Sequence, residues 1–204
     1  MPYQPNHIYH IYNQGNNQQY IFFQKRNYSF FINKMRQYLL PYVDILCYCL
    51  MPNHFHWMVH TKMEACMPSN AIKPRKKIQT SNNNLIQSDD YQQNLSHAIG
   101  KLLSSYTKAI NKQEQRSGSL FRSHTKAKNG IIEELITINN EDTLIFKPNN
   151  PYVKICFNYI HNNPVKAHLV AKPEYWEHSS AQDYKGLRNN DLCNQQLAQK
   201  IIWQ

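Results

Sequence analysis

One hairpin constrains the fold of this sequence more than any other feature. Residues 43–51 (VDILCYCLM) are almost continuously apolar, as in a strand that is buried on both faces. Pro52 and Asn53 then turn the chain into residues 54–61. Along this second segment the side chains alternate, with Phe55, Trp57 and Val59 on one side and His54, His56, Met58 and His60 on the other. The pattern predicts a strand with one apolar face and one histidine-bearing face.

The segments around the hairpin alternate between strand and helix patterns. Ile- and Tyr-rich residues predict a first strand over 7–15, and residues 120–132 are compatible with another strand. Apolar residues at helical spacing predict helices over 27–40, 94–113 and 151–162. Pro164 is expected to end or restart the last helix. This order predicts an α+β fold, a ferredoxin-like open antiparallel sheet with helices packed on one face.

The chain of 204 residues is long enough for one ordinary domain with a hydrophobic core. We expect residues 1–170 to form that domain. Within it, residues 62–90 contain few apolar side chains and are interpreted as a loop insertion. Residues 171–204 are expected to be a C-terminal tail that packs on the same domain.

The charge balance narrows the class of partner. Lys and Arg number 23 against 13 Asp and Glu, a net charge of +10, which favours nucleic acid or an anionic membrane surface. No apolar run approaches the roughly 18–20 residues of a membrane span, and the first residues do not resemble a secretory signal. The five cysteines are scattered, without a C-x-x-C pair. A cytoplasmic protein with free thiols is therefore expected.

His54 and His56 are candidate metal ligands. Residues two apart on a strand project from the same face, so both imidazoles can converge on one ion and leave positions for a third ligand and a substrate oxygen. The alternative is a strand that simply displays polar side chains. The fully apolar opposite face raises the weight of the metal interpretation.

Tyr159 and Asn163 lie four residues apart and share a face of the predicted helix. A tyrosine there can attack a phosphorus atom while the amide oxygen of Asn163 completes a metal shell. The alternative for Tyr159 is packing between helix and sheet. Tyr106 is a rival nucleophile, but Ile110 in its i+4 position cannot bind a metal, so it is interpreted as core. His161 and His168 are interpreted as surface or capping residues.

Four basic residues flank the predicted strand at 120–132. They are Arg116, Arg122, Lys126 and Lys128, with Phe121 and His124 among them. Cations mixed with rings can follow a phosphate backbone and stack unpaired bases, so these four are candidate DNA-binding residues. A charged, exposed edge is an equal alternative. A second basic cluster, Lys73–Lys77, fits a solvated tract as well as a DNA contact.

Several motifs together resemble one family. Met51-Pro52-Asn53-His54-Phe55-His56 resembles the M-P-N-H-x-H signature of the REP-associated tyrosine transposases, relatives of the single-tyrosine HUH transposases. Three further stretches are similar to that family: Ser105–Lys108 with Ser117–Phe121, then Tyr159–Ala167 (YIHNNPVKA), and Trp176–Gly186 (WEHSSAQDYKG). The order and spacing hold from residue 8 to about residue 186. The stretches at 62–90 and 139–150 look longer than in the family, Glu177 and His178 are inserted in the last motif, and Lys166 and His168 replace Arg and Gly.

The resemblance implies a site and a reaction. It assigns His54, His56 and Asn163 as ligands of a divalent metal, Mg²⁺ or Mn²⁺, and Tyr159 as the nucleophile. The implied activity is a metal-dependent single-strand DNA endonuclease and strand transferase that acts on single-stranded or hairpin DNA through a 5′-phosphotyrosine intermediate.

Two other functions remain open. The first is a DNA-binding protein without chemistry, such as a repressor or architectural module, and the second is a metalloenzyme unrelated to DNA. A membrane partner is not expected, because the histidine face and the Tyr159–Asn163 pair have no use there. The sequence leaves a monomer and a homodimer equally open.

Overall fold

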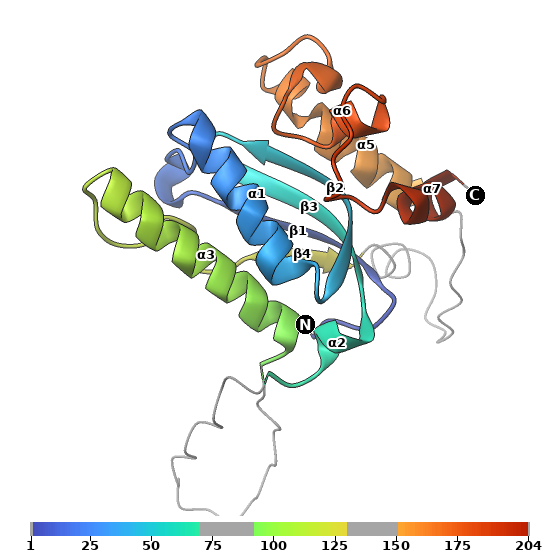
Figure 1. Cartoon of the computed structure of the whole chain (residues 1–204), viewed down its shortest axis with the longest axis horizontal. Helices are drawn as coiled ribbons and strands as arrows, with labels where there is room; N and C mark the ends of the chain where they lie inside the picture. The colour runs from blue at the N-terminus through green and yellow to red at the C-terminus, as the bar shows by residue number, and fades with distance from the viewer. Residues whose placement is uncertain (1, 70–91, 130–150, 204) are drawn as a thin grey trace, which may run out of the picture.

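The computed structural model describes residues 2–69, 92–129 and 151–203 (Figure 1). Its strands are β1 (Ile8–Gln14), β2 (Val43–Met51), β3 (His54–Thr61) and β4 (Lys126–Asn129). Its α-helices are α1 (Lys25–Leu39), α2 (Met63–Cys66), α3 (Asn94–Gln113), α5 (Pro151–Lys166), α6 (Ala181–Tyr184) and α7 (Gln195–Trp203). Two short 3₁₀ helices cover Asn16–Gln18 and Pro173–Tyr175.

The strands form one four-stranded sheet in the order β2-β3-β1-β4, and each neighbouring pair is antiparallel. The predicted α+β fold with an open antiparallel sheet is confirmed. The hairpin is also as predicted, since Met51 pairs with His54 across the Pro52–Asn53 turn. β1 lies beside β3, so residues far apart in the chain become neighbours, as in the pair Tyr12 and His56, 44 positions apart.

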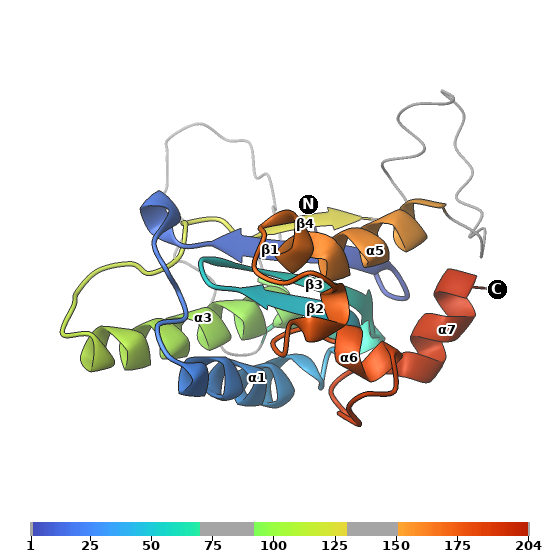
Figure 2. The same cartoon turned by 90° about the horizontal axis from the view of Figure 1, so that it is seen from above.

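Helices cover both faces of the sheet. On one face α1 and α3 lie side by side over Phe55, Trp57 and Val59 (Figure 1). On the other face α5 and α7 pack against β2 and Met58. The sequence predicted helices on one face of the sheet, and α1 and α3 form that layer. α5 and α7 form a second layer on the opposite face, and Figure 2 shows α5 across the sheet from α1 and α3. The apolar run of β2 explains this second layer, because Leu46 and Cys47 need burial on the face that α1 and α3 leave open.

The segment before β4 departs from its prediction. Within residues 120–129, regular strand pairing begins at Lys126, and Leu120 and Phe121 are buried in the α1/α3 core. Because the side chains of Leu120 and Phe121 are buried in that core, the backbone there cannot stay in line with the edge of the sheet. This explains why the strand is shorter than predicted. The rest of the predicted strand, residues 130–132, lies outside the described residues.

The predicted loop insertion at 62–90 is described in part. Its first residues form the short helix α2, while residues 70–90, including the basic cluster Lys73–Lys77, lie outside the described residues. The same holds for 139–150. All five cysteines are free thiols. Within the described parts of the chain, no helix is long and apolar enough to cross a membrane.

The segment after α5 covers the outer edge of β2. Leu50 donates its N–H to His178 O (2.9 Å), and the N–H of Ser180 reaches Tyr48 O (3.0 Å). Trp176 Nε1 donates to Leu50 O at 2.9 Å. An edge strand with open backbone groups invites pairing with other chains, so these bonds protect β2.

Candidate functional site

The β2–β3 turn is held in place from outside. Pro52 O accepts hydrogen bonds from the N–H groups of Ile21 (2.8 Å) and Phe22 (3.1 Å). Asn53 O accepts one from Gly15 N at 2.8 Å. The turn that carries His54 is therefore tied to the end of β1 and to the segment before α1.

His54 and His56 each have one ring nitrogen engaged. His54 Nδ1 lies 2.6 Å from Asn53 Oδ1, and His56 Nδ1 lies 2.9 Å from Nε2 of His10 on β1. The two rings of His54 and His56 are 5.1 Å apart between centroids and almost perpendicular, at 85°. With both Nδ1 atoms engaged, Nε2 is the ring nitrogen that each of the two histidines keeps for another partner.

Both imidazoles favour the neutral form that a metal ligand requires. Burial, together with the neighbouring rings of His10 and His54, lowers the pKa of His56 to about 2. Burial also lowers the pKa of His54, while its hydrogen bond with Asn163 acts in the opposite direction. His56 is 5 % exposed, so water reaches little of its ring.

α5 presents Tyr159 and Asn163 to this histidine face. Val153, Phe157 and Ile160 recur at helical spacing and anchor the helix in the core beside β2. Tyr159 and Asn163 lie on the adjoining stripe, four residues apart. The anchoring of α5 thus fixes which of its faces meets β3.

α5 continues through Pro164 to Lys166, where the sequence predicted an end or a restart. Proline lacks the N–H that would bond to Ile160 O. Asn163 Nδ2 lies 3.5 Å from Ile160 O and donates to Tyr159 O at 2.8 Å. The Asn163 amide group thereby supplies part of the hydrogen bonding to the helix backbone that is lost because Pro164 has no N–H.

The same bonds fix the orientation of the Asn163 amide. Because Nδ2 faces the helix backbone, the oxygen is the amide atom directed outward. Asn163 is also a hydrogen-bond partner of the His54 side chain. An amide oxygen and two imidazole nitrogens are thus brought together from α5 and β3.

Tyr159 stands beside His56, with ring centroids 5.5 Å apart, and its side chain is 39 % exposed. Its ring also borders His10, at 6.1 Å. Lys166 Nζ lies 5.0 Å from the Tyr159 ring centroid. Tyr159 and His56 line a cavity of about 310 Å³ whose other walls come from His10, Tyr12, Lys128, Tyr152, Ile155 and Cys156. The phenol is accessible to a ligand next to the histidines.

Tyr106 is buried core, as predicted. It is 0 % exposed, and its hydroxyl donates to Ile21 O at 2.7 Å. His161 differs from its prediction as a surface or capping residue, because it is buried and its Nε2 lies 2.8 Å from Ser180 Oγ. It packs against Phe157 between α5 and the C-terminal segment, where an apolar neighbour covers its ring. His168 is exposed just beyond α5.

The four candidate DNA-binding residues separate into two places. Lys126 pairs with Tyr12 and Lys128 with His10 in the sheet, so both lysines share the face that carries His56. Among the described residues that line the Tyr159 cavity, Lys128 is the single Lys or Arg. Arg116 is half-buried and donates to Ser119 O at 3.4 Å, and Arg122 is exposed in the segment before β4.

Sequence reasoning missed His10 and the side-chain role of Asn53. His10 shares its face of β1 with Ile8 and Tyr12, so that face was readable, but its contact with His56 depends on the pairing of β1 with β3. Asn53 was recognised as a turn residue. Its side chain also orients His54.

The donor set fits a divalent ion. Two neutral imidazoles and an amide oxygen suit Mn²⁺ and similar ions and leave positions for phosphate oxygens. No group of three or more His, Cys, Asp or Glu side chains that could hold a metal occurs in the described parts of the chain. Among the described residues, Asn163 is the side chain that adds an amide oxygen to the His54 and His56 imidazoles.

Comparisons with known proteins bear on the fold. The structure is similar to the solved structure of a REP-associated tyrosine transposase bound to a REP hairpin, with a TM-score of 0.54 and 13 % sequence identity. The similarity covers 95 % of this chain and 92 % of that one. At this identity the likeness is one of fold. No protein-family model and no curated protein matches the sequence.

Proposed function

We propose that the protein is a metal-dependent single-strand DNA endonuclease and strand transferase of the tyrosine transposase type. The observation that carries the proposal is the meeting of Tyr159 with the His54–His56 pair and Asn163. Tyr159 is accessible and faces the histidines, as a nucleophile beside a metal centre must. The fold likeness to a transposase bound to a DNA hairpin supports DNA as the substrate.

His54, His56 and Asn163 would hold Mg²⁺ or Mn²⁺, which would supply Lewis-acid polarisation of the scissile phosphate. Tyr159 Oη attacks the phosphorus and loses its proton. The bond from phosphorus to the 3′ oxygen breaks, and that oxygen leaves as a 3′-OH. The products are a 5′-phosphotyrosine and a free 3′-OH. Attack by a second 3′-OH reverses these steps and joins strands without ATP.

The surrounding residues have roles in this proposal. Lys128 and Lys166 place positive charge at the cavity, where the phosphate binds. Lys126, Arg116 and Arg122 contact the DNA backbone away from the reacting bond. His10 holds Nδ1 of His56 and so directs Nε2 of that ring to the metal. Residues 1–170 form the catalytic domain, and 171–204 are a tail of that domain.

The test is a labelled single-stranded DNA hairpin incubated with the protein and Mn²⁺, followed by denaturing electrophoresis. Wild-type protein should give a covalent protein–DNA band that Tyr159→Phe abolishes. Tyr106→Phe is the matched control, because it removes the rival hydroxyl and costs about 1 kcal/mol of stability without touching the site. His54→Ala and chelation by EDTA should remove the band while DNA binding persists.

A DNA-binding protein without chemistry gives a different result. It binds the hairpin in a salt-dependent manner and forms no covalent band with either metal. A band that survives in Tyr159→Phe would assign the chemistry to another residue.

A further inference from the structure

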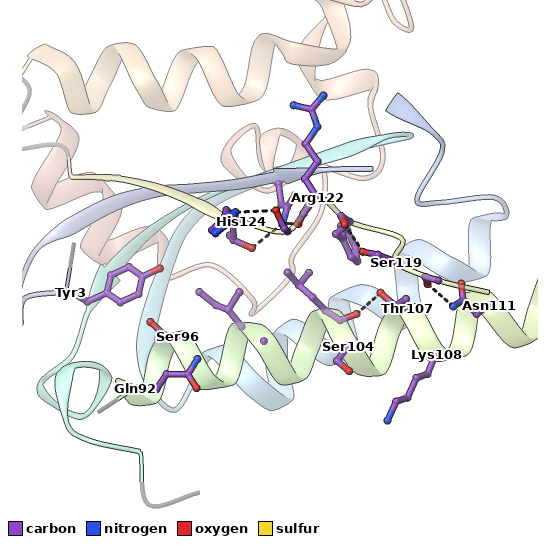
Figure 3. A pocket seen from close by; sticks show the side chains of 18 residues that line it. Tyr3, Gln92, Ser96, Ser104, Thr107, Lys108, Asn111, Ser119, Arg122 and His124 are labelled. Carbon is purple, nitrogen blue, oxygen red and sulfur yellow. Dashed lines mark hydrogen bonds between the residues drawn. The ribbon is translucent and has the colours of Figure 1, made fainter. Parts of the chain in front are cut away.

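A second hollow lies on the face of the sheet opposite to α5. It is a groove of about 760 Å³ between α3 and residues 118–125, and it continues past Asn13 to Tyr3 (Figure 3). α3 belongs to the layer that packs on Phe55 and Trp57, whereas Tyr159 belongs to the α5 layer. The groove is therefore separate from the catalytic cavity.

The groove is lined mostly by small and polar side chains. α3 contributes Ser96, Gly100, Ser104, Thr107, Lys108 and Asn111, together with the apolar Ile99 and Leu103. The facing wall is Ser119, Arg122, Ser123, His124 and Thr125. Among the described residues that line it there is no Asp or Glu. Hydroxyl and amide groups, together with Lys and Arg side chains, are the groups with which proteins contact the phosphate and sugar oxygens of DNA.

Two cations stand at the rims of this groove. Lys108 and Arg122 are exposed, and Figure 3 shows their side chains pointing in opposite directions, Lys108 away from the facing wall and Arg122 away from α3. Within the described residues neither forms an ion pair. Residues 92–129 as a whole hold seven Lys and Arg and a single Glu. This net charge of +6 is more than half of the +10 of the chain.

The groove floor is open at Gly100. A Cβ atom added there would meet nothing within 4 Å, and Gly100 is exposed in the middle of α3. Glycine in a helix interior costs about 1 kcal/mol relative to alanine, and no neighbouring atom requires it at this position. An absent side chain lets another backbone approach the helix closely.

One segment of chain connects the groove to the catalytic face. Arg122 to Thr125 line the groove, and Lys126 and Lys128 follow on the face that carries His10 and His56. Arg122 and Lys128 are six positions apart, which is at most about 20 Å of chain. A strand of DNA that leaves the cavity across β4 would meet Lys126 and then Arg122.

We propose that this groove binds the sugar–phosphate backbone of a nucleic-acid strand, as a second DNA contact distinct from the Tyr159 cavity. The proposal rests on the proposed function, because it takes DNA as the ligand. It differs in requiring neither the metal nor the nucleophile.

Binding without chemistry tests the groove. The probe is a fluorescein-labelled DNA hairpin with single-stranded flanks, titrated with Tyr159→Phe protein in EDTA and followed by anisotropy. Gly100→Gln places a neutral, helix-compatible side chain in the groove and should weaken binding at least 5-fold without lowering the melting temperature. Lys108→Gln should weaken binding about 3-fold and reduce the slope of log affinity against log salt by about 1.

Lys101→Gln and Lys112→Gln are the matched controls. Both lysines are exposed on α3 outside the groove lining and lose the same charge, so their affinities and slopes should stay within 1.5-fold of the parent. Equal effects at all three lysines, or no effect of Gly100→Gln, would overturn the groove while leaving the covalent band of the wild type intact. Absence of any DNA binding would remove the groove and the proposed function together.

Discussion

The hydrogen-bond partner of His56 Nδ1 determines whether the ring is held in one orientation, with Nε2 left to bind a metal ion. His10 Nε2 occupies the position 2.9 Å from His56 Nδ1, and His10 itself is 7 % exposed. With His56 Nδ1 donating to His10, the His56 lone pair is on Nε2, directed to the site. In the proposed site His10 is therefore a positioning residue, which would act on the metal through His56.

His10→Ala should lower Mn²⁺ affinity about 10-fold, because loss of such an orienting partner typically costs 10–100-fold. Isothermal titration with Mn²⁺ measures this in the absence of DNA. His10→Gln, whose amide oxygen can accept from Nδ1, should recover most of the affinity. His60→Ala removes a histidine from the same face of β3 outside the site and serves as the control. Equal affinities of His10→Ala and wild type would contradict the role.

At the scale of elements, the position of the hairpin depends on how closely β1 ends beside it. Gly15 donates its N–H to Asn53 O, and a Cβ atom on Gly15 would lie 2.2 Å from the backbone oxygen of Gln19. Its φ of −59° is ordinary, so the constraint on Gly15 is space alone. The glycine permits the 3₁₀ turn at Asn16–Gln18 to fold back under the β2–β3 turn.

Gly15→Ala should destabilise the protein by about 1–3 kcal/mol, since the clash is with backbone that has to move. It should also weaken Mn²⁺ binding, because Asn53 orients His54. Urea unfolding and metal titration give the two values. The same substitution at Gly100 meets no atom within 4 Å and should add up to about 1 kcal/mol of stability. A Gly15→Ala protein as stable as wild type would show that the turn accommodates the methyl group.

These elements show what the sequence can and cannot predict. The faces of β3 follow from alternation within one segment, so the shared face of His54 and His56 was readable from local order. His10 and His56 are 46 residues apart and lie on different strands, and a single sequence does not specify which strands pair. Pro164 misled for another reason, because the Asn163 side chain supplies hydrogen bonds that local preference rules assign to the backbone.

At the scale of the whole molecule, the C-terminal segment is joined to the sheet through a mostly buried histidine. His178 stacks on Tyr28 of α1, with ring centroids 3.6 Å apart, and its side chain is 14 % exposed. Burial, with smaller contributions from Lys25 and Arg188 and an opposing one from Glu177, lowers the pKa of His178 to about 4. His178 is therefore neutral in the folded protein at neutral pH.

The sign of the resulting pH dependence follows from proton uptake. In the unfolded chain His178 has the ordinary histidine pKa of about 6.5, so below that pH the unfolded state binds more protons than the folded state. The contribution of neutral His178 to the free energy of unfolding is therefore fully present above pH 6.5, and it is lost as the pH falls toward 4. At pH 5 the difference of about 1.5 pH units corresponds to roughly 2 kcal/mol.

His178→Phe keeps a flat ring on Tyr28 and removes the titration. Urea unfolding at pH 7.5 and pH 5.0 should therefore show a loss of stability in wild type that exceeds the loss in His178→Phe by about 2 kcal/mol. The control is His168→Asn, at an exposed position with a φ of 56°, a backbone conformation that asparagine accepts. This control should lose as much stability as wild type between the two pH values. Equal losses in wild type and His178→Phe would mean that His178 binds a proton as readily in the folded protein as in the unfolded chain.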